Sequence, residues 1–296
     1  MKVSLCLPYM EREYDRTTTL EWCRLADAGP FASLSCGERI TSYTQDMRVV
    51  LSAAAALTER IRIVPSLYVL PMHSPVRVAK EMATLDVLSA GRVTVTVGVG
   101  GRADDYKALE SPFTNRLQRL DDGVAAMRRI WAGEPPFAGA DPVGPTPIQA
   151  GGPPIWAGAM NPNAMRRASA WADGVYGFSM DAGVKTVREQ RERARAAWLE
   201  RGRSEPYIAT GFWYSLAAGA EATLKTYVYE YLKIIDDGIA KAVAETMTCF
   251  TADAVANALD AIEAEGCDEC FLVPASLDTA EIERAADVIA RRRWPS

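Results

Sequence analysis

The sequence contains very little histidine and cysteine. His73 is the only histidine, and there are six cysteines in 296 residues. A single imidazole excludes every zinc site that needs two histidines. Six cysteines are also too few to form a disulfide framework in a chain of this length. Cys267 and Cys270 form a C-x-x-C motif, but the second opens an apolar run typical of a strand. We therefore predict buried structural thiols and no metal site.

Positive charge is also scarce. The chain has 33 lysines and arginines against 38 acidic residues, which gives a net charge of −5. A surface that binds nucleic acid needs an excess of positive charge, so we predict no nucleic-acid partner. Near the N-terminus Pro8 interrupts the apolar run, and acidic residues follow it, unlike a secretory signal or a spanning helix. We expect a cytoplasmic protein that has no membrane segment.

The apolar residues are arranged as short β-rich runs that alternate with longer helical stripes. With 49% hydrophobic and 24% charged residues, the chain has enough apolar material for a large core. Strands are predicted at 3–7, 31–35, 62–70, 92–99, 155–159, 174–179, 207–216 and 270–274. Helices are predicted at 19–28, 46–57, 117–131, 163–171, 184–201, 220–232, 251–265 and 279–293, and one more begins at Pro75 and is ended by Gly91.

This alternation predicts the fold class. Eight β-runs, each followed by a helix and none paired as a hairpin, favour a closed (β/α)8 TIM barrel, with an open doubly wound sheet as the alternative. The length of the chain suits one barrel domain over residues 1–296. The proline- and glycine-rich segment 133–154 is interpreted as a surface loop within it.

In such a barrel, ligands bind at the C-terminal ends of the strands. The predicted strand 92–99 runs into Gly98-Val99-Gly100-Gly101-Arg102. Backbone without side chains lets a flat or phosphorylated ligand approach closely, although glycines that only shape a turn explain the pattern equally well. The spacing is not the G-x-G-x-x-G of dinucleotide-binding domains, so that interpretation is weak.

Other strand ends carry polar or aromatic residues. The segment 158–163 places small and amide side chains before a helix, which suits either a phosphate or an ordinary N-cap. Glu38 and Arg39 form either a rim salt bridge or a charged pair that faces a substrate. His73 either contributes to chemistry or fixes the loop before the next helix. Trp213 and Tyr214 point to opposite faces of a strand, so one of them either lines the mouth or fills the core.

Several segments of the chain carry recognisable motifs. They are AAAALTERIR (53–62), LPMHSPVRVAKEMATLDVL (70–88), SAGR (89–92), VGVGGR (97–102), DYKAL (105–109), PIWAG (154–158) and AWADG (170–174). Together they resemble one family, the bacterial luciferase-like flavin- or deazaflavin-dependent oxidoreductases. The resemblance implies a TIM barrel of the luciferase-like type that holds FMN or coenzyme F-420 and catalyses hydride transfer or oxygen activation. The family's cofactor contacts fall on Ser66 and Leu67, where relatives often have a strained or cis peptide behind the ring, on Gly98 and Gly100 beside it, and on Gly158, Ala159, Met160 and Asn163 around the phosphate.

The sequence departs from the family at two positions. Relatives often read Gly-Glu-His after the second strand, whereas this chain has Arg39 in place of the histidine. Relatives that oxidise sugar phosphates also carry a glutamate near the Gly100 turn, where this chain has Gly101-Arg102. We therefore predict that Arg39 and Arg102, with Glu38 orienting Arg39, supply positive charge beside a reduced ring or an acidic substrate.

The resulting hypothesis is an oxidoreductase that acts on a small organic molecule and assembles as a homodimer. The apolar stripe 46–57 would suit the dimer contact, although burial of this stripe against the barrel explains it equally well. A non-catalytic binding protein that has kept the fold is the alternative. An aldolase-like barrel is disfavoured because Lys80, Lys107 and Lys185 do not lie at predicted strand ends.

Overall fold

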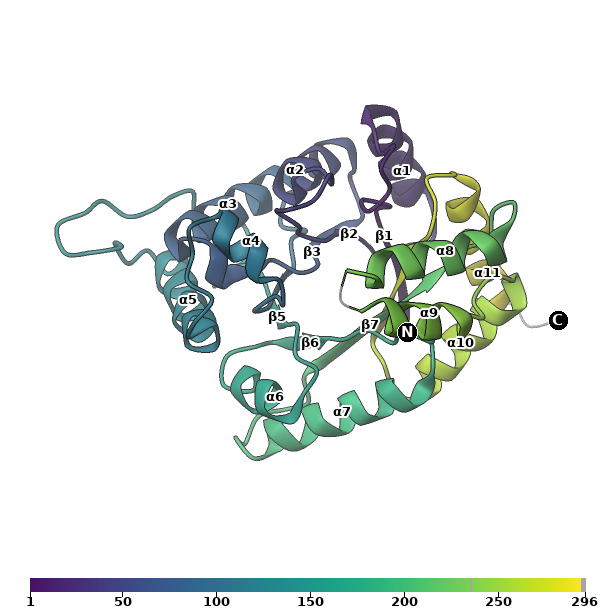
Figure 1. Cartoon of the computed structure of the whole chain (residues 1–296). Helices are drawn as coiled ribbons and strands as arrows, with labels where there is room; N and C mark the ends of the chain where they lie inside the picture. The colour runs from purple at the N-terminus through teal and green to yellow at the C-terminus, as the bar shows by residue number, and fades with distance from the viewer. Residues whose placement is uncertain (235, 294–296) are drawn as a thin grey trace. The chain divides into compact units, whose positions relative to one another are not determined.

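The computed structural model describes residues 1–234 and 236–293. Its strands are β1 (Lys2–Cys6), β2 (Ser33–Cys36), β3 (Arg62–Pro65), β4 (Val95–Val97), β5 (Ile155–Ala157), β6 (Gly174–Tyr176), β7 (Tyr207–Tyr214) and β8 (Glu269–Pro274). Its helices are α1 (Arg16–Ala28), α2 (Met47–Leu57), η1 (Leu70–Met72), α3 (Pro75–Leu88), α4 (Ala103–Ala108), α5 (Arg116–Trp131), α6 (Pro162–Ala168), α7 (Val184–Leu199), α8 (Ala220–Leu232), α9 (Asp237–Glu245), α10 (Ala252–Ala264) and α11 (Ala280–Arg293). Figure 1 labels them along the chain.

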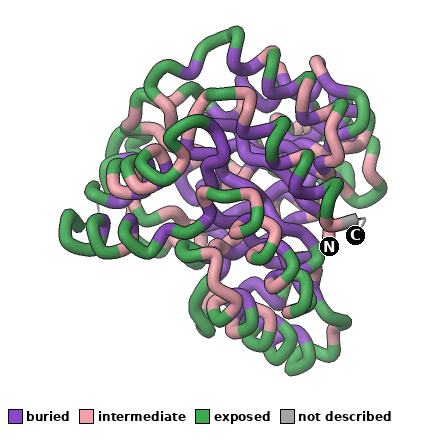
Figure 2. Tube along the Cα trace, turned by 90° about the vertical axis from the view of Figure 1, so that its right-hand side faces the viewer, coloured by how far each residue is buried: buried purple, intermediate pink, exposed green. Residues whose placement is uncertain are grey.

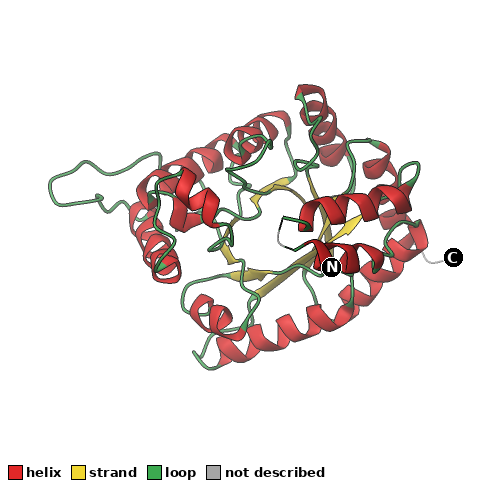
Figure 3. Ribbon diagram, in the orientation of Figure 1, coloured by secondary structure: helices red, strands yellow, loops and turns green. Residues whose placement is uncertain are grey.

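The strands form one eight-stranded sheet in the order β3-β2-β1-β8-β7-β6-β5-β4. Its first and last members, β3 and β4, are joined by parallel bridges from Ile63 to Val93 and from Tyr68 to Val97. A sheet whose end strands pair with each other is a barrel, and helices follow the strands along the chain (Figure 3). The predicted (β/α)8 fold is confirmed.

The chain divides into two compact units, which are described separately. Unit 1 comprises residues 1–34, 177–193 and 207–296, and unit 2 comprises 35–176 and 194–206. In both, the strands are buried and the exposed residues lie on helices and loops (Figure 2). None of the helices in the described part of the chain has the length and apolar character needed to cross a membrane.

Unit 1 is organised around parallel strands that share a buried carboxylate. β8 lies between β1 and β7, in register with both. Glu269, at the start of β8, accepts hydrogen bonds from the Ser4, Ser33 and Tyr207 hydroxyls at 2.5, 2.6 and 2.9 Å. A buried carboxylate is tolerated when such donors satisfy its oxygens. These contacts fix one face of the sheet.

Unit 2 contains α2 to α6 and a long loop, 133–154, that projects away from α3 and α5 (Figure 1). α2 begins where Asp46 accepts the N–H groups of Arg48 and Val49. α3 begins at Pro75, whose missing N–H is not needed in a first turn. Both starts lie within one residue of the predicted ones.

Arg92, the last residue of the SAGR motif, secures the C-terminal end of α2. Its guanidinium donates to the carbonyls of Ala55, Thr58 and Ile61 at 2.9, 2.7 and 2.6 Å. A further hydrogen bond reaches the Thr58 hydroxyl at 2.9 Å. These carbonyls are helix-end and loop acceptors that would otherwise be buried without partners.

Several predicted boundaries differ from the observed ones, and the helices α4 and α9 were not predicted. The predicted strand 62–70 ends at Pro65, because the chain turns there into the segment that leads to η1. The predicted strand 92–99 is limited to Val95–Val97. The helices α4 and α9 are too short to show a clear apolar period, although Asp236 caps α9 by accepting the Ile239 N–H.

All six cysteines are buried thiols, as predicted. Burial, with a smaller contribution from Asp27, raises the pKa of Cys23 to about 12. Burial likewise raises the pKa of Cys249 to about 11. Since thiolate is the nucleophilic form, these thiols are unreactive near neutral pH.

We expect Arg92→Lys to lower the free energy of unfolding by about 2–3 kcal/mol, because an ammonium group cannot reproduce the forked contacts to the end of α2. Urea unfolding measures the change. Arg77→Lys is the matched control, since the Arg77 side chain is 73% exposed and pairs with Glu81, and it should change stability by less than about 0.5 kcal/mol. Equal effects of both substitutions would contradict the assignment.

Candidate active site

The predicted cofactor residues lie at adjacent strand ends within unit 2. The Tyr68 N–H donates to the Thr96 carbonyl at 2.7 Å, and the Gly98 N–H returns to the Tyr68 carbonyl at 3.0 Å. The Gly158 N–H donates to the Val97 carbonyl at 2.8 Å. These bonds bring the segments after β3, β4 and β5 together, as parallel strands in a barrel require.

The Ser66–Leu67 peptide bond is cis, as the resemblance implied. The Leu67 side chain lies directly over two of the predicted glycines. A Cβ atom at Gly98 would stand 2.9 Å from Leu67 Cδ2, and one at Gly158 would stand 2.5 Å from the same atom. Gly98 and Gly158 are therefore glycines because Leu67 packs on them. The backbone of Gly98, predicted to be open to a ring, and that of Gly158, a predicted phosphate contact, are both covered by this leucine.

The two glycines of the following turn differ from each other. Gly100 has φ +58°, and a Cβ atom there would stand 2.8 Å from Val69 Cγ1. Both observations require glycine at this position. At Gly101 a Cβ atom would meet nothing within 4 Å, so the open backbone of the turn is at Gly101. A valine at Gly100 would disturb the loop itself as well as any bound ring.

Glu38 holds the loop after β3 from the opposite side. One carboxylate oxygen accepts the Val69 N–H at 2.7 Å, and the other lies 2.8 Å from His73 Nε2. Both side chains are nearly buried, and the Tyr68 ring packs edge-on against the imidazole, with centroids 5.0 Å apart. His73 therefore fixes the loop before α3, one of the two roles considered for it. Glu38 therefore positions the loop after β3, which forms part of the candidate site.

Arg102 connects α4 to the segment after β2. Its guanidinium donates to the Thr41 carbonyl and hydroxyl at 3.3 and 3.2 Å, and lies 3.5 Å from the Asp105 carboxylate. Burial tends to raise the pKa of Asp105, but hydrogen bonds from Thr41 and the charge of Arg102 outweigh it and lower the pKa. Arg102 stays partly exposed, and so does Arg39.

The segment after β5 forms a conventional helix start. Asn161 accepts the Ala164 N–H at 2.9 Å and caps α6, while Pro162 has no N–H to offer. Asn163, the predicted phosphate contact, accepts a hydrogen bond from Arg166 at 3.1 Å through its side chain. The capping residue is thus Asn161. Ala159 is buried and Met160 is exposed.

The ends of β7 and β8, where many TIM barrels bind phosphate, carry a carboxylate instead. Glu281 is fully buried in the first turn of α11. It accepts hydrogen bonds from the Ser215 and Ser276 hydroxyls at 2.7 and 3.1 Å and from the Leu216 N–H at 2.5 Å. The hydroxyl and N–H donors that a phosphate would use there are therefore already engaged by this carboxylate. Sequence reasoning missed this site, although Ser276 and Glu281 flank the predicted start of the last helix.

Trp213 and Tyr214 face opposite sides of β7, as predicted. The Tyr214 hydroxyl donates to the Glu281 carbonyl at 3.1 Å, so Tyr214 faces α11. Trp213 contacts Phe178 and Tyr231, with ring centroids 4.6 and 5.4 Å apart. The aromatic side chain on the face away from α11 is therefore Trp213.

We expect Glu38→Ala to lower the free energy of unfolding by about 2–4 kcal/mol, because the Val69 N–H and His73 lose their buried acceptor. Glu38→Gln keeps an acceptor for Val69 and should lose roughly 1 kcal/mol. Hydrogen exchange gives a local readout, in which the Val69 amide should exchange at least about tenfold faster in the alanine variant alone. Unchanged exchange in Glu38→Ala would show that the carboxylate does not hold this loop.

Comparisons with known proteins agree with this architecture. The family model described as luciferase-like monooxygenase matches residues 1–290. The oxygenase component of a flavin-dependent trigonelline monooxygenase from Acinetobacter baylyi is 28% identical over 182 residues, 55% of this chain and 50% of that protein. The 2,5-diketocamphane 1,2-monooxygenase 1 of Pseudomonas putida is 29% identical over 121 residues, 40% of this chain and 33% of that protein. The chain spans half or less of the length of these two curated relatives.

Solved structures show the same fold. The monooxygenase RslO1 from Streptomyces bottropensis has a TM-score of 0.80 at 22% identity, with 99% of this chain and 98% of that chain covered. An F420-dependent secondary alcohol dehydrogenase in complex with an F420-acetone adduct has a TM-score of 0.79 at 18% identity, with 99% of each chain covered. Since the family model extends over nearly the whole sequence, this chain belongs to the luciferase-like monooxygenase family.

Proposed function

We propose that this chain is a cytoplasmic oxidoreductase that uses reduced FMN or the deazaflavin coenzyme F-420 to transfer hydride to, or to oxygenate, a small organic substrate. The observation that supports it most is the meeting of the segments after β3, β4 and β5 in a member of this family. The proteins to which this chain is similar include a flavin-dependent monooxygenase and an F420-dependent alcohol dehydrogenase. The proposal therefore includes both coenzymes.

The residues present fit a flat redox ring. Val69, Met72 and Tyr106 form a buried apolar cluster, against which Ile40, Leu67 and Phe113 pack. The ring would lie against the Ser66–Leu67 backbone and the open Gly101 turn, with this cluster excluding water around it. When bound, the reduced coenzyme supplies the electron pair for the reaction.

Charge in this region favours an anion. Arg39 and Arg102 are partly exposed cations, and Glu38 is already engaged by Val69 and His73. We propose that the two arginines bind the anionic edge of a reduced ring or an acidic group of the substrate. The coenzyme phosphate would lie near Gly158, Ala159, Met160 and Asn163, because Glu281 already engages the hydroxyl and N–H donors at the ends of β7 and β8.

An anaerobic spectral titration of the purified protein tests this function. FMN and F-420, each oxidised and reduced, are added separately, and ring absorbance and fluorescence are followed. We expect one coenzyme to bind in its reduced form with a dissociation constant in the micromolar range. If neither coenzyme changes its spectrum at micromolar protein, the enzyme proposal fails and the non-catalytic binding protein remains.

We expect Arg102→Gln to weaken binding of the reduced coenzyme about tenfold, because one charge-assisted contact to an anion is lost. Lys107→Gln removes the same charge from an exposed position of α4 and serves as the control, with an expected change below about twofold. The same titration gives both constants. Equal weakening in the two variants would indicate long-range charge effects and contradict a direct role of Arg102.

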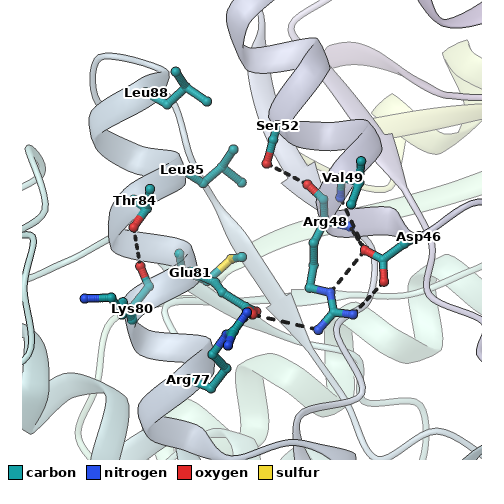
Figure 4. A pocket seen from close by; sticks show the side chains of 11 residues that line it. Asp46, Arg48, Val49, Ser52, Arg77, Lys80, Glu81, Thr84, Leu85 and Leu88 are labelled. Atoms are coloured by element: carbon teal, nitrogen blue, oxygen red, sulfur yellow. Dashed lines mark hydrogen bonds and ion pairs between the residues drawn. The ribbon is translucent and has the colours of Figure 1, made fainter. Parts of the chain in front are cut away.

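We also propose that the protein is a homodimer that pairs through α2 and α3. A groove of about 750 Å³ runs between these helices (Figure 4). Val49 and Leu88 are exposed apolar side chains that line it. Arg48 pairs with Asp46 at 2.5 Å, and Arg77 pairs with Glu81 at 2.6 Å. A groove with apolar residues and both charge signs suits a two-fold contact, in which each sign can meet its opposite.

Light scattering after size-exclusion chromatography tests the dimer. Val49 is 69% exposed on α2, and Val49→Glu should weaken dimerisation at least about tenfold, because a carboxylate would be buried in the contact. Leu199 is 76% exposed on α7, so Leu199→Glu should leave the mass unchanged. A wild-type protein that is monomeric at micromolar concentration would contradict the proposal.

A further inference from the structure

Three aromatic rings gather at the C-terminal ends of β6 and β7 in unit 1. Trp213, near the end of β7, contacts Phe178 with ring centroids 4.6 Å apart and an interplanar angle of 63°. On its other side Tyr231 of α8 lies 5.4 Å away at 61°. We call these three residues the β7 aromatic cluster. Both contacts have the edge-to-face geometry that aromatic rings favour.

The alternation of side chains along β7 places Trp213 on the face of the strand opposite the one that contacts α11. Tyr207, Gly211 and Trp213 share one face of β7, and the Tyr207 hydroxyl on that face reaches the buried Glu269. A Cβ atom at Gly211 would stand 3.5 Å from the Phe178 ring, an ordinary contact distance, so Phe178 lies beside this position of the strand; the close neighbour that favours glycine here is the Phe271 carbonyl oxygen at 2.8 Å. Tyr214, on the other face, contacts α11. The cluster therefore occupies the sheet face opposite α11.

The indole N–H of Trp213 is a donor in need of an acceptor. Trp22, Trp131 and Trp171 donate their indole N–H groups to protein oxygens, each at 3.0 Å. For Trp213, which is only 5% exposed, the described part of the chain provides no hydrogen-bond partner. Trp213 Nε1 is not among the side-chain atoms that are buried without a partner, so it keeps some access to solvent, and a bound molecule could supply the acceptor in place of water.

We propose that the β7 aromatic cluster binds the planar, conjugated part of the organic substrate, and that the Trp213 N–H donates to an oxygen or nitrogen atom on that ring system. This rests on the proposed function, because enzymes with this fold hold their substrates at the C-terminal ends of the strands. It goes further by naming the substrate class. Phe178 and Tyr231 are half-buried and present ring edges to such a molecule, while Trp213 supplies both a ring and a donor.

Calorimetric titration with 2-naphthol tests the proposal without any coenzyme or turnover. Its saturated analogue, decahydro-2-naphthol, carries the same hydroxyl group on rings that are not planar. We expect 2-naphthol to bind with a dissociation constant of about 1 mM or lower, and the analogue at least about tenfold more weakly. Equal affinity for the two compounds would overturn the proposal.

Two variants separate the contribution of the Trp213 N–H from that of the neighbouring aromatic rings. Trp213→Phe removes the N–H and keeps a ring, and Tyr231→Leu removes one ring, so each should weaken 2-naphthol binding about fivefold. Tyr229→Leu is the matched control on α8, because the Tyr229 hydroxyl donates to Asp237 at 2.7 Å outside the cluster, and it should change affinity by less than about twofold. Thermal unfolding identifies variants that fail to fold.

The outcomes distinguish this proposal from the proposed function. If 2-naphthol affinity falls in Trp213→Phe and Tyr231→Leu but neither coenzyme binds the wild type, the aromatic site stands and the oxidoreductase proposal fails. If a coenzyme binds while folded Trp213→Phe and Tyr231→Leu variants keep wild-type affinity for 2-naphthol, the cluster is only core packing and this inference is overturned.

Discussion

The position of the candidate site depends on how the segment after β3 is held. The Glu38 carboxylate holds this segment by hydrogen bonds to the Val69 N–H and to His73. The Leu67 side chain packs into the space left by Gly98 and Gly158. These contacts come from the ends of β2, β4 and β5, so the segment has one position relative to them. A loop fixed on both sides provides the preorganised backbone that a flat ring needs, because no reorganisation is required on binding.

Buried carboxylates decide where an anionic ligand can go. Glu269 and Glu281 lie at opposite ends of β8 and its following segment, and each is satisfied by hydroxyl groups. Glu281 lies at the strand ends where many other barrels bind phosphate, and Glu38 is engaged by the Val69 N–H and His73. Arg39 and Arg102 are partly exposed at the segments after β2 and β4, and Asp105 offsets part of the charge of Arg102. This distribution is the physical basis for proposing that an anionic coenzyme binds in unit 2.

The sequence was sufficient for the fold because local periodicity and family motifs agree on eight strand–helix repeats. It was less informative about the site. The Glu38–His73 contact joins residues that are 35 positions apart in the sequence. The apolar periodicity that indicates helices and strands does not show which distant polar residues will meet. Gly98 and Gly158, both predicted to contact the cofactor, are covered by Leu67, because the pattern shows where side chains are missing but not which neighbouring side chain fills the space. The segment 158–163 suited either a phosphate or an N-cap, and the sequence did not indicate which of its amide side chains would cap the helix; the structure shows that Asn161 does.

A crystal structure of the protein grown with a saturating concentration of the reduced coenzyme tests the central claim most directly. The account predicts density for three fused rings beside the Ser66–Leu67 backbone and the Gly101 turn, with an arginine, Arg39 or Arg102, within hydrogen-bonding distance of the ring's polar edge. Density for the ring beside Glu281 at the ends of β7 and β8, or an empty mouth at saturation, would contradict it.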